Sequence, residues 1–194
     1  MEQTNKPFIN PPKPRKDIET LQQYSAPLEG RRNLLRLDFN ENTIGPSPFV
    51  IQSLREISRE EISIYPEYSG LKEKVVETLI KQNSKVNISS SEVGIFNGVD
   101  AALNAIFHAY GDINDLMLTT SPTFGYYTPC AQMRGMKINS IPYEGNNFQY
   151  PFEKTCELIT QNNPKILLIC NPNNPTGTRL SPKKIMEMTK LSPN

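Results

Sequence analysis

The chain has 194 residues, of which 37% are apolar and 21% charged, a length that fits one domain or one domain with part of another. Its 21 Lys and Arg residues balance 20 Asp and Glu residues, and this even charge without a basic run excludes an ordinary nucleic-acid-binding surface. Three widely spaced cysteines form neither a disulfide framework nor a metal site, and no apolar run reaches the ~18 residues of a membrane span. We therefore expect a cytoplasmic protein that binds no metal, no nucleic acid and no membrane.

The first thirty residues contain five prolines, a density that disfavours helix interiors and central strands. We expect an extended arm there, interrupted by a short helix over 18–24. An extended stretch over 34–39 and a Gly-Pro turn over 45–48 follow.

Two amphipathic helices are predicted next. Apolar residues recur at helical spacing over 49–59 and again over 71–81. The segment between them contains Pro66 and Gly70, which mark a loop.

From residue 91 the pattern alternates between short apolar runs and amphipathic segments, which is typical of βαβ units. Strands are expected over 93–96, 116–119, 137–142 and 166–170, and helices over 100–110, 126–133, 152–161 and 181–190. The predicted fold class is therefore α/β, with a mainly parallel sheet and flanking helices.

Polar turns follow three of these strands, over 97–100, 121–127 and 171–177. Each alone also has a structural interpretation: Asp100 could be an N-cap, the aromatic residues after 121 could be core, and the third turn could be a proline-fixed loop. However, open parallel sheets bind ligands at the carboxyl ends of their strands. The coincidence of three such turns predicts one ligand site, with Gly98 allowing an anion to approach the start of a helix.

The turn Asn171 to Gly177 resembles the signature turn of the aminotransferases that use pyridoxal phosphate and share the fold-type-I architecture. The resemblance covers most of the chain. Its other motifs are Tyr24, Asn40 to Asn42, Gly45 to Pro48, Tyr65-Pro66, Gly98 to Asp100 and Pro122 to Phe124. They occur in the order and approximate spacing of histidinol-phosphate aminotransferases.

The resemblance implies pyridoxal 5'-phosphate as the cofactor and assigns residues to it. Gly98, Val99 and Asp100 would bind the cofactor phosphate, largely through backbone N–H groups. Phe124, where the family often has tyrosine, would stack on the pyridine ring. Asn174 would hydrogen-bond the phenolic oxygen and so tune the electron sink.

The resemblance also implies a homodimer, in which Tyr65 would reach the phosphate of the other subunit's cofactor. Tyr24, Asn40 and Gly45 would border the substrate. The sequence departs from the family at Gln23, where a proline is usual.

By the same resemblance, residues 1–45 would form an N-terminal arm and part of the small domain, and residues 46–194 part of the cofactor-binding large domain. The lysine that holds the cofactor as a Schiff base, the Asp for its pyridinium nitrogen and the Arg for the substrate carboxylate would lie beyond the 171–177 turn. No lysine of this chain has the family's Ser-Lys context before a glycine-rich stretch. We therefore assign no catalytic residue and expect this chain to be inactive by itself.

The function implied is that of the N-terminal portion of a histidinol-phosphate aminotransferase, an enzyme of histidine biosynthesis that moves an amino group between glutamate and imidazole-acetol phosphate. Threonine-phosphate decarboxylases and other class I and II aminotransferases carry nearly the same turns and remain alternatives. A non-catalytic truncated fragment is the alternative from a different class.

Overall fold

The computed structural model describes residues 13–21, 29–37 and 39–191. These fall into two compact units, which we call the sheet unit (residues 13–21 and 96–191) and the helical unit (residues 29–37 and 39–95). The two are taken separately below. The domain boundary expected near residue 46 remains a prediction.

A three-stranded parallel sheet organises the sheet unit. The strands β1 (Leu116–Ser121), β2 (Lys137–Pro142) and β3 (Ile166–Leu167) lie in the order β2-β1-β3. β1 pairs in parallel with both neighbours, with Leu116 opposite Lys137 and Met117 opposite Ile166. The parallel α/β arrangement expected from the sequence is confirmed.

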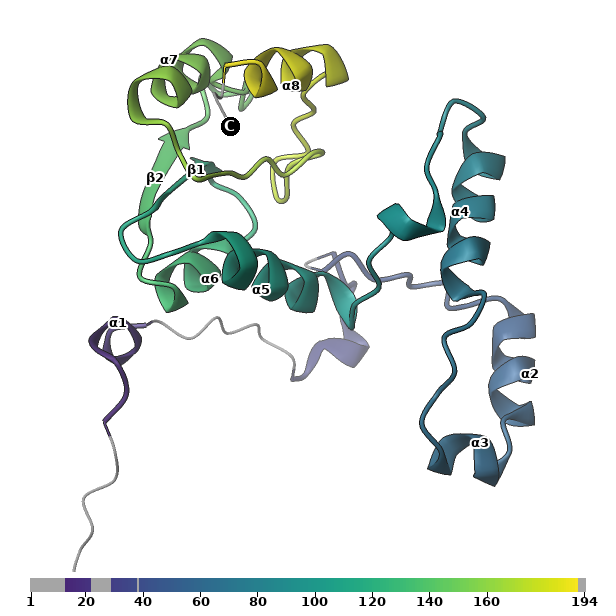
Figure 1. The fold of residues 1–194 in the computed structure, drawn as a ribbon. Helices are drawn as coiled ribbons and strands as arrows, with labels where there is room; N and C mark the ends of the chain where they lie inside the picture. Colours follow the sequence, from purple (N-terminus) through teal and green to yellow (C-terminus); the bar gives the residue numbers. More distant parts are fainter. Residues whose placement is uncertain (1–12, 22–28, 38, 192–194) are drawn as a thin grey trace, which may run out of the picture. The chain divides into compact units, whose positions relative to one another are not determined.

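Helices cover both faces of this sheet (Figure 1). Their bounds are α1 Lys16–Glu19, α5 Gly98–Tyr110, α6 Tyr127–Met133, α7 Phe152–Asn162 and α8 Pro182–Thr189. Because successive side chains of a strand point to opposite faces, β1 serves two cores. Met117 packs in a cluster with Phe107 of α5 and Cys130 of α6. Leu118 packs in the other, with Ile159 and Met188 from α7 and α8.

The strand expected over 93–96 is absent from the described residues, and this prediction was wrong. A strand forms only when a neighbour accepts its hydrogen bonds, and no described strand pairs with this segment. Its apolar side chains are half exposed, with Ile95 at 43% and Phe96 at 49%. The fourth predicted strand is also shorter than expected, since β3 ends at Leu167.

The helical unit consists of α2 (Pro48–Glu56), α3 (Arg59–Ser63), α4 (Leu71–Gln82) and two short 3-10 turns, η1 (Arg31–Asn33) and η2 (Ser90–Glu92). The single helix expected over 49–59 is broken in two. Ser58 begins a new helix as its N-cap, because its hydroxyl accepts from the N–H of Glu61 while the Glu61 carboxylate accepts from the N–H of Ser58. The described residues of α2, α3 and α4 include no buried side chain.

Of the helix expected over 18–24, only the part before residue 22 lies among the described residues, where α1 ends at Glu19. The stretch expected to be extended over 34–39 follows η1 and contains no helix at residues 34–37, and Asp38 lies outside the described residues. Within the described ranges, none of the helices combines the length and apolarity that crossing a bilayer requires.

Candidate functional site

The candidate site lies at the carboxyl edge of the sheet, where the chain continues beyond the neighbouring strands β1 and β3. We call residues 122–126 the β1 turn and residues 171–177 the β3 turn. One side chain joins them. Asn173 donates from Nδ2 to the carbonyl oxygen of Pro122 (3.0 Å) and to Oγ1 of Thr176 (2.8 Å), and its Oδ1 accepts from Oγ1 of Thr123 (2.8 Å). With only 3% of its surface exposed, Asn173 is a buried polar group whose hydrogen-bonding capacity is largely used.

Asn171 fixes the base of the β3 turn in the same way. Its Nδ2 donates to the carbonyl oxygen of Leu180 (3.0 Å), and its Oδ1 accepts from the N–H of Leu180 (2.9 Å). Within the turn, the N–H of Gly177 donates to the carbonyl oxygen of Asn173 (2.7 Å). The turn is therefore held at its base and at its centre by side-chain amides.

Asn174 is the exception among these three asparagines. It is exposed, and among the residues that the structure describes its amide makes no hydrogen bond. An amide offers two donors and one acceptor, so Asn174 presents them at the carboxyl edge from a turn whose neighbours hold it in place.

Phe124 lies in the β1 turn, half buried, with its ring against the edge of Tyr127 at a centroid distance of 5.4 Å and an interplanar angle of 79°. Such edge-to-face pairs fix ring orientation. Burial raises the pKa of the Tyr127 phenol, and the thiol of Cys170 beside it adds to the rise. Tyr127 therefore stays neutral at physiological pH. The half-exposed ring of Phe124 lies in the β1 turn, which Asn173 ties to the β3 turn.

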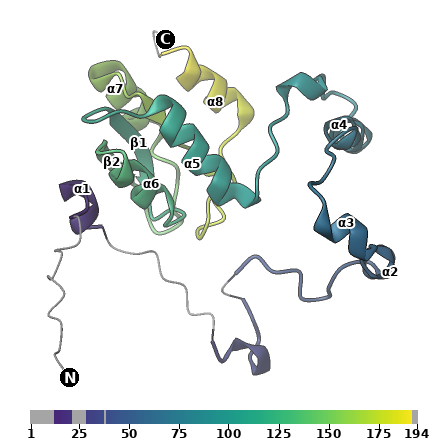
Figure 2. The ribbon, with the colours of Figure 1, turned by 60° about the horizontal axis from the view of Figure 1, so that its bottom comes forward.

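The third predicted element, Gly98 to Asp100, forms the first turn of α5. α5 ends at Tyr110, shortly before β1 begins, and packs Phe107 against Met117. A 13-residue helix extends for about 20 Å, so its start points towards the carboxyl edge (Figure 2). Gly98 has φ +79°, and a Cβ built there would meet nothing within 4 Å, so the space above it is open.

The start of α5 also has free donors. Its N-cap, Asn97, makes no side-chain hydrogen bond to the helix. The N–H groups of the first turn have no acceptor inside a helix, and together with the helix dipole they attract an anion. Val99 is 62% exposed, which leaves the backbone of this turn accessible.

The remaining predicted residues belong to the helical unit or lie outside the described chain. Gly45 closes a turn in which Asn42 donates to its carbonyl oxygen (2.8 Å). Asn40 is exposed and Tyr65 is 97% exposed. Tyr24 lies outside the described residues. Their expected roles towards substrate and partner stay predictions.

Sequence reasoning missed the residues whose side chains hold the two turns, namely Asn171, Asn173, Thr123 and Thr176. All four stand in the motifs that were singled out. The sequence did offer one signal, a Thr in each of the two turns. An Asn that is buried between two turns needs a hydrogen-bond partner in each of them.

The geometry defines an α/β protein with an anion-attracting helix start, an aromatic face and a free amide along one sheet edge. This combination is typical of a site for a flat, phosphorylated cofactor. Among residues 13–21, 29–37 and 39–191, no group of three His, Cys, Asp or Glu side chains could hold a metal ion.

Comparison with known proteins identifies the class more closely. The sequence profile of the family Aminotransferase class I and II matches residues 32–194. The chain belongs to the class I and II aminotransferases.

Curated relatives carry two activities. A histidinol-phosphate aminotransferase of Moorella thermoacetica is 32% identical over 172 residues, which are 88% of this chain and 41% of the relative. A histidinol-phosphate aminotransferase of Archaeoglobus fulgidus is 34% identical over 80% of this chain and 46% of its own length. A dihydroxyacetone phosphate transaminase of Campylobacter jejuni is 31% identical over 92% of this chain and 49% of its own length. The chain thus spans about half the length of these relatives.

Solved structures agree on the fold. The histidinol-phosphate aminotransferase of Sinorhizobium meliloti, in complex with pyridoxal 5'-phosphate, superposes with a TM-score of 0.65 at 17% identity, covering 79% of this chain and 40% of that one. Apo-BacF of Bacillus subtilis superposes with a TM-score of 0.72 at 21% identity, covering 92% of this chain and 47% of that one. The fold class predicted from the sequence, part of the fold-type-I architecture, is confirmed.

Proposed function

We propose that this chain supplies one wall of the pyridoxal 5'-phosphate site of an aminotransferase acting on a small phosphorylated ketone. The observation that carries the proposal is the contrast within the β3 turn. Asn171 and Asn173 use their amides to hold the turn, whereas Asn174 keeps its amide free.

The residues at the carboxyl edge suit this cofactor. The open space at Gly98 leaves room for a phosphate against the N–H groups of Val99 and Asp100, which would hold it by hydrogen bonds and by the helix dipole. Phe124 would cover one face of the pyridine ring. Asn174 would orient the ring through its phenolic oxygen. When bound, the cofactor supplies the electron sink that amino transfer requires.

The substrate proposed first is imidazole-acetol phosphate with glutamate as amino donor, a reaction of histidine biosynthesis. Its support is the number of histidinol-phosphate aminotransferases among the relatives, three of which are 29%, 32% and 34% identical to this chain. Dihydroxyacetone phosphate is the second candidate, because the Campylobacter relative named for it is 31% identical over 92% of the chain. Both candidates are ketones that carry a phosphate ester.

The proposed assembly is a homodimer with shared sites. In it, Tyr65 would bind the phosphate of the cofactor held by the other subunit. Its support in this chain is exposure: at 97%, the Tyr65 side chain is open to a partner outside its own unit.

The cofactor site is tested by titrating the 194-residue chain with pyridoxal 5'-phosphate in a calorimeter. We expect saturable binding whose tightest step is weakened about tenfold by Asn174→Ala, because a hydrogen bond to a charged or strongly polar group contributes roughly 1.5 kcal/mol or more. The matched control is Asn162→Ala, at the exposed end of α7. Equal affinities for the two variants would contradict the role given to Asn174.

The substrate is tested separately, in a protein that joins this chain to a segment carrying the expected cofactor-binding lysine. Glutamate is supplied with either ketone, and 2-oxoglutarate is measured. Faster release with imidazole-acetol phosphate supports the first candidate, and faster release with dihydroxyacetone phosphate supports the second. Release with neither ketone would reject both substrates.

A further inference from the structure

A second pocket lies behind the β3 turn, within the sheet unit. It has a volume of about 670 Å³, in the range of small-molecule sites, which are roughly 300–1,000 Å³. Three short segments line it: residues 147–150 before α7, residues 176–181, which begin at the end of the β3 turn, and Lys184 in the first turns of α8. Figure 1 shows α8, in yellow, beside α7.

The charged residues that line this pocket are all positive. Its charged lining residues are Arg179 and Lys184, and none of the described residues that line it is acidic. Arg179 is exposed and forms no ion pair or hydrogen bond with any described residue. The Lys184 ammonium lies over the Phe152 ring, 4.5 Å from its centroid, which directs the ammonium without neutralising it.

Neutral polar residues line the pocket as well. They are Asn147, Gln149, Thr178 and Ser181. A guanidinium presents paired donors that match two oxygens of a phosphate, and an ammonium adds a point charge. The aromatic ring of Phe148, 43% exposed, borders the same space and offers a face to an organic group.

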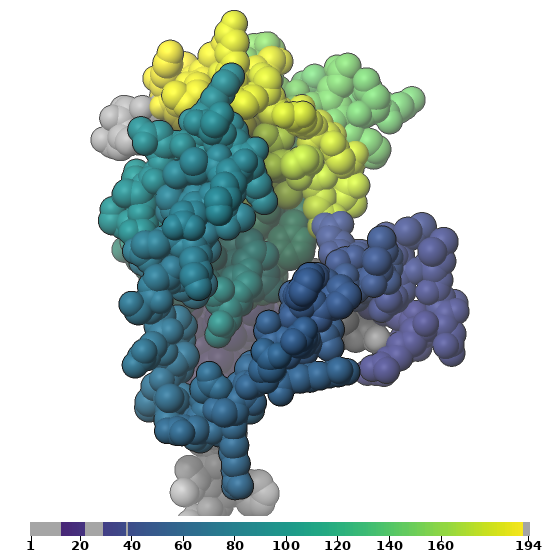
Figure 3. Space-filling view, turned by 90° about the vertical axis from the view of Figure 1, so that its right-hand side faces the viewer, coloured from purple at the N-terminus to yellow at the C-terminus, as the bar shows by residue number. Residues whose placement is uncertain are grey.

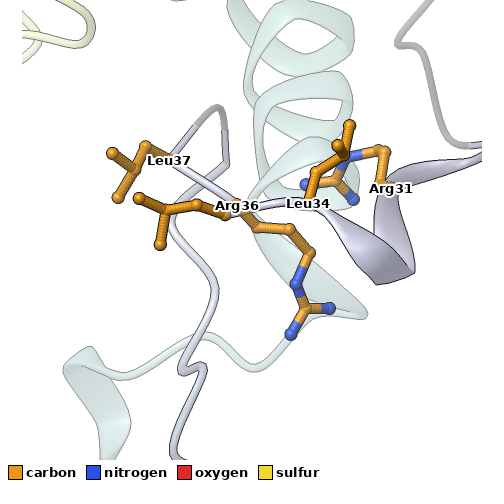
Figure 4. A pocket seen from close by; sticks show the side chains of 5 residues that line it. Arg31, Leu34, Arg36 and Leu37 are labelled. Carbon is orange, nitrogen blue, oxygen red and sulfur yellow. The ribbon is translucent and has the colours of Figure 1, made fainter.

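The other hollow of note, in the helical unit, lacks these features. It measures about 340 Å³ and is lined by Arg31, Leu34, Leu35, Arg36 and Leu37 (Figure 4). Both of its arginines already face a carboxylate, since Glu41 lies 3.1 Å from Arg31 and 3.4 Å from Arg36. An anion would have to displace Glu41 there, whereas it would meet unpaired Arg179 in the pocket behind the β3 turn.

We propose that the pocket behind the β3 turn binds the phosphate group of a small phosphomonoester, with Arg179 and Lys184 as its ligands and Phe148 against the organic part. This site is distinct from the proposed cofactor site. Its two cations and Phe148 lie outside α5, the β1 turn and the β3 turn, although Thr176 and Gly177 of the β3 turn border it. It goes beyond the proposed function and does not depend on it.

The pocket is connected by hydrogen bonds to Asn173, the neighbour of Asn174 in the chain. The Oγ1 atoms of Thr178 and Thr176 lie 2.8 Å apart, and Thr176 Oγ1 accepts from Nδ2 of Asn173. Thr178 Oγ1 also donates to the carbonyl oxygen of Phe148 (2.7 Å). A ligand that contacts Thr178 and Phe148 therefore touches the hydrogen-bond network that holds the β3 turn.

The test is a titration of the ¹⁵N-labelled 194-residue chain, followed by amide chemical shifts. The probes are inorganic phosphate and phenyl phosphate. We expect saturable shifts at Thr178, Arg179 and Lys184, with phenyl phosphate binding more tightly because its ring can contact Phe148. Shifts confined to Val99 and Asp100 would place phosphate at the start of α5 and overturn the proposal while leaving the cofactor site intact.

Matched variants separate a built site from general attraction. Arg179→Gln and Lys184→Gln should each weaken phenyl phosphate binding about tenfold. Lys183→Gln removes the same charge from the neighbouring position, which does not line the pocket, and should change the affinity less than twofold. An equal loss in Lys183→Gln, or no saturable binding by the unaltered chain, would overturn the proposal. Far-ultraviolet circular dichroism checks that each variant is folded.

Discussion

Asn173 and Asn174 are neighbours in the chain with opposite surroundings. Asn173 is 3% exposed and makes three side-chain hydrogen bonds that tie the β3 turn to the β1 turn. Asn174 is exposed and makes none with the described residues. Asn173 therefore stabilises the carboxyl edge of the sheet, and Asn174 is available for binding.

This difference predicts opposite effects of the same substitution. Asn173→Ala leaves the Pro122 carbonyl oxygen and two Thr hydroxyls without their partner, so we expect the free energy of unfolding to fall by about 2–3 kcal/mol. Asn174→Ala removes an exposed side chain, and we expect a change within about 0.5 kcal/mol. Urea unfolding followed by circular dichroism measures both, and a loss of similar size in the two variants would contradict this division.

At the level of single residues, the sequence indicated the turns of the site but not the side chains that hold these turns together. Gly98, Phe124 and Asn174 stand in recognisable turns at strand ends, and the structure brings these turns to one edge. The role of Asn173 could not be predicted because it depends on β1 and β3 being neighbours. The strand order β2-β1-β3 places two turns together that are 50 residues apart in the chain, between Thr123 and Asn173.

Among the elements, α3 shows how a local hydrogen-bond pattern overrides hydrophobic periodicity. Apolar residues continue at helical spacing through Ile57, yet α2 ends at Glu56 and a new helix begins after Ser58. The Ser-x-x-Glu capping box supplies acceptors for the backbone N–H groups at the start of a helix, and so favours a new helix start at this point. This motif was visible in the sequence. The strand expected over 93–96 failed for a different reason, because pairing is not encoded in the segment itself.

The capping box makes a prediction about ionisation. The backbone N–H of Ser58 and then its hydroxyl lower the pKa of Glu61. Because of this lowered pKa, Glu61 stabilises α3 fully at pH values above the ordinary pKa of a glutamate, near 4.3. This stabilisation is lost as the pH falls through the lowered pKa. Ser58→Ala removes the hydroxyl and should raise the pKa of Glu61 partway. Ser58→Pro also removes the N–H and should raise it further.

Side-chain carboxyl shifts recorded by NMR from pH 2 to pH 7 measure this pKa. The expected order is unaltered chain, Ser58→Ala, Ser58→Pro, from lowest to highest. An unchanged Glu61 pKa in Ser58→Pro would show that the capping box does not form in solution.

Across the whole molecule, burial is unevenly divided between the two units. In the sheet unit, Met117 and Leu118 of β1 are fully buried, and each face of the sheet has its own cluster. In the helical unit, large apolar side chains remain exposed, among them Phe49 at 79%, Leu54 at 58% and Ile62 at 76%. Figure 3 shows one face of these helices, in blue and teal, open to solvent.

Because tertiary packing rather than intrinsic propensity supplies most helix stability, two helices of similar length should differ in hydrogen exchange. α4 has 12 residues and none is buried, whereas α7 has 11 and buries Thr155 and Ile159. In the 194-residue chain we expect the central amides of α4 to exchange at least about 100-fold faster than those of α7, since local opening of α4 breaks no core contact. Amide exchange followed by NMR at neutral pH measures both helices in one sample, which removes differences in solvent conditions.

Equal protection of the two helices would contradict this prediction and mean that α4 buries its apolar face in solution. If the protection of α4 rises with protein concentration, a second copy of the chain covers that face.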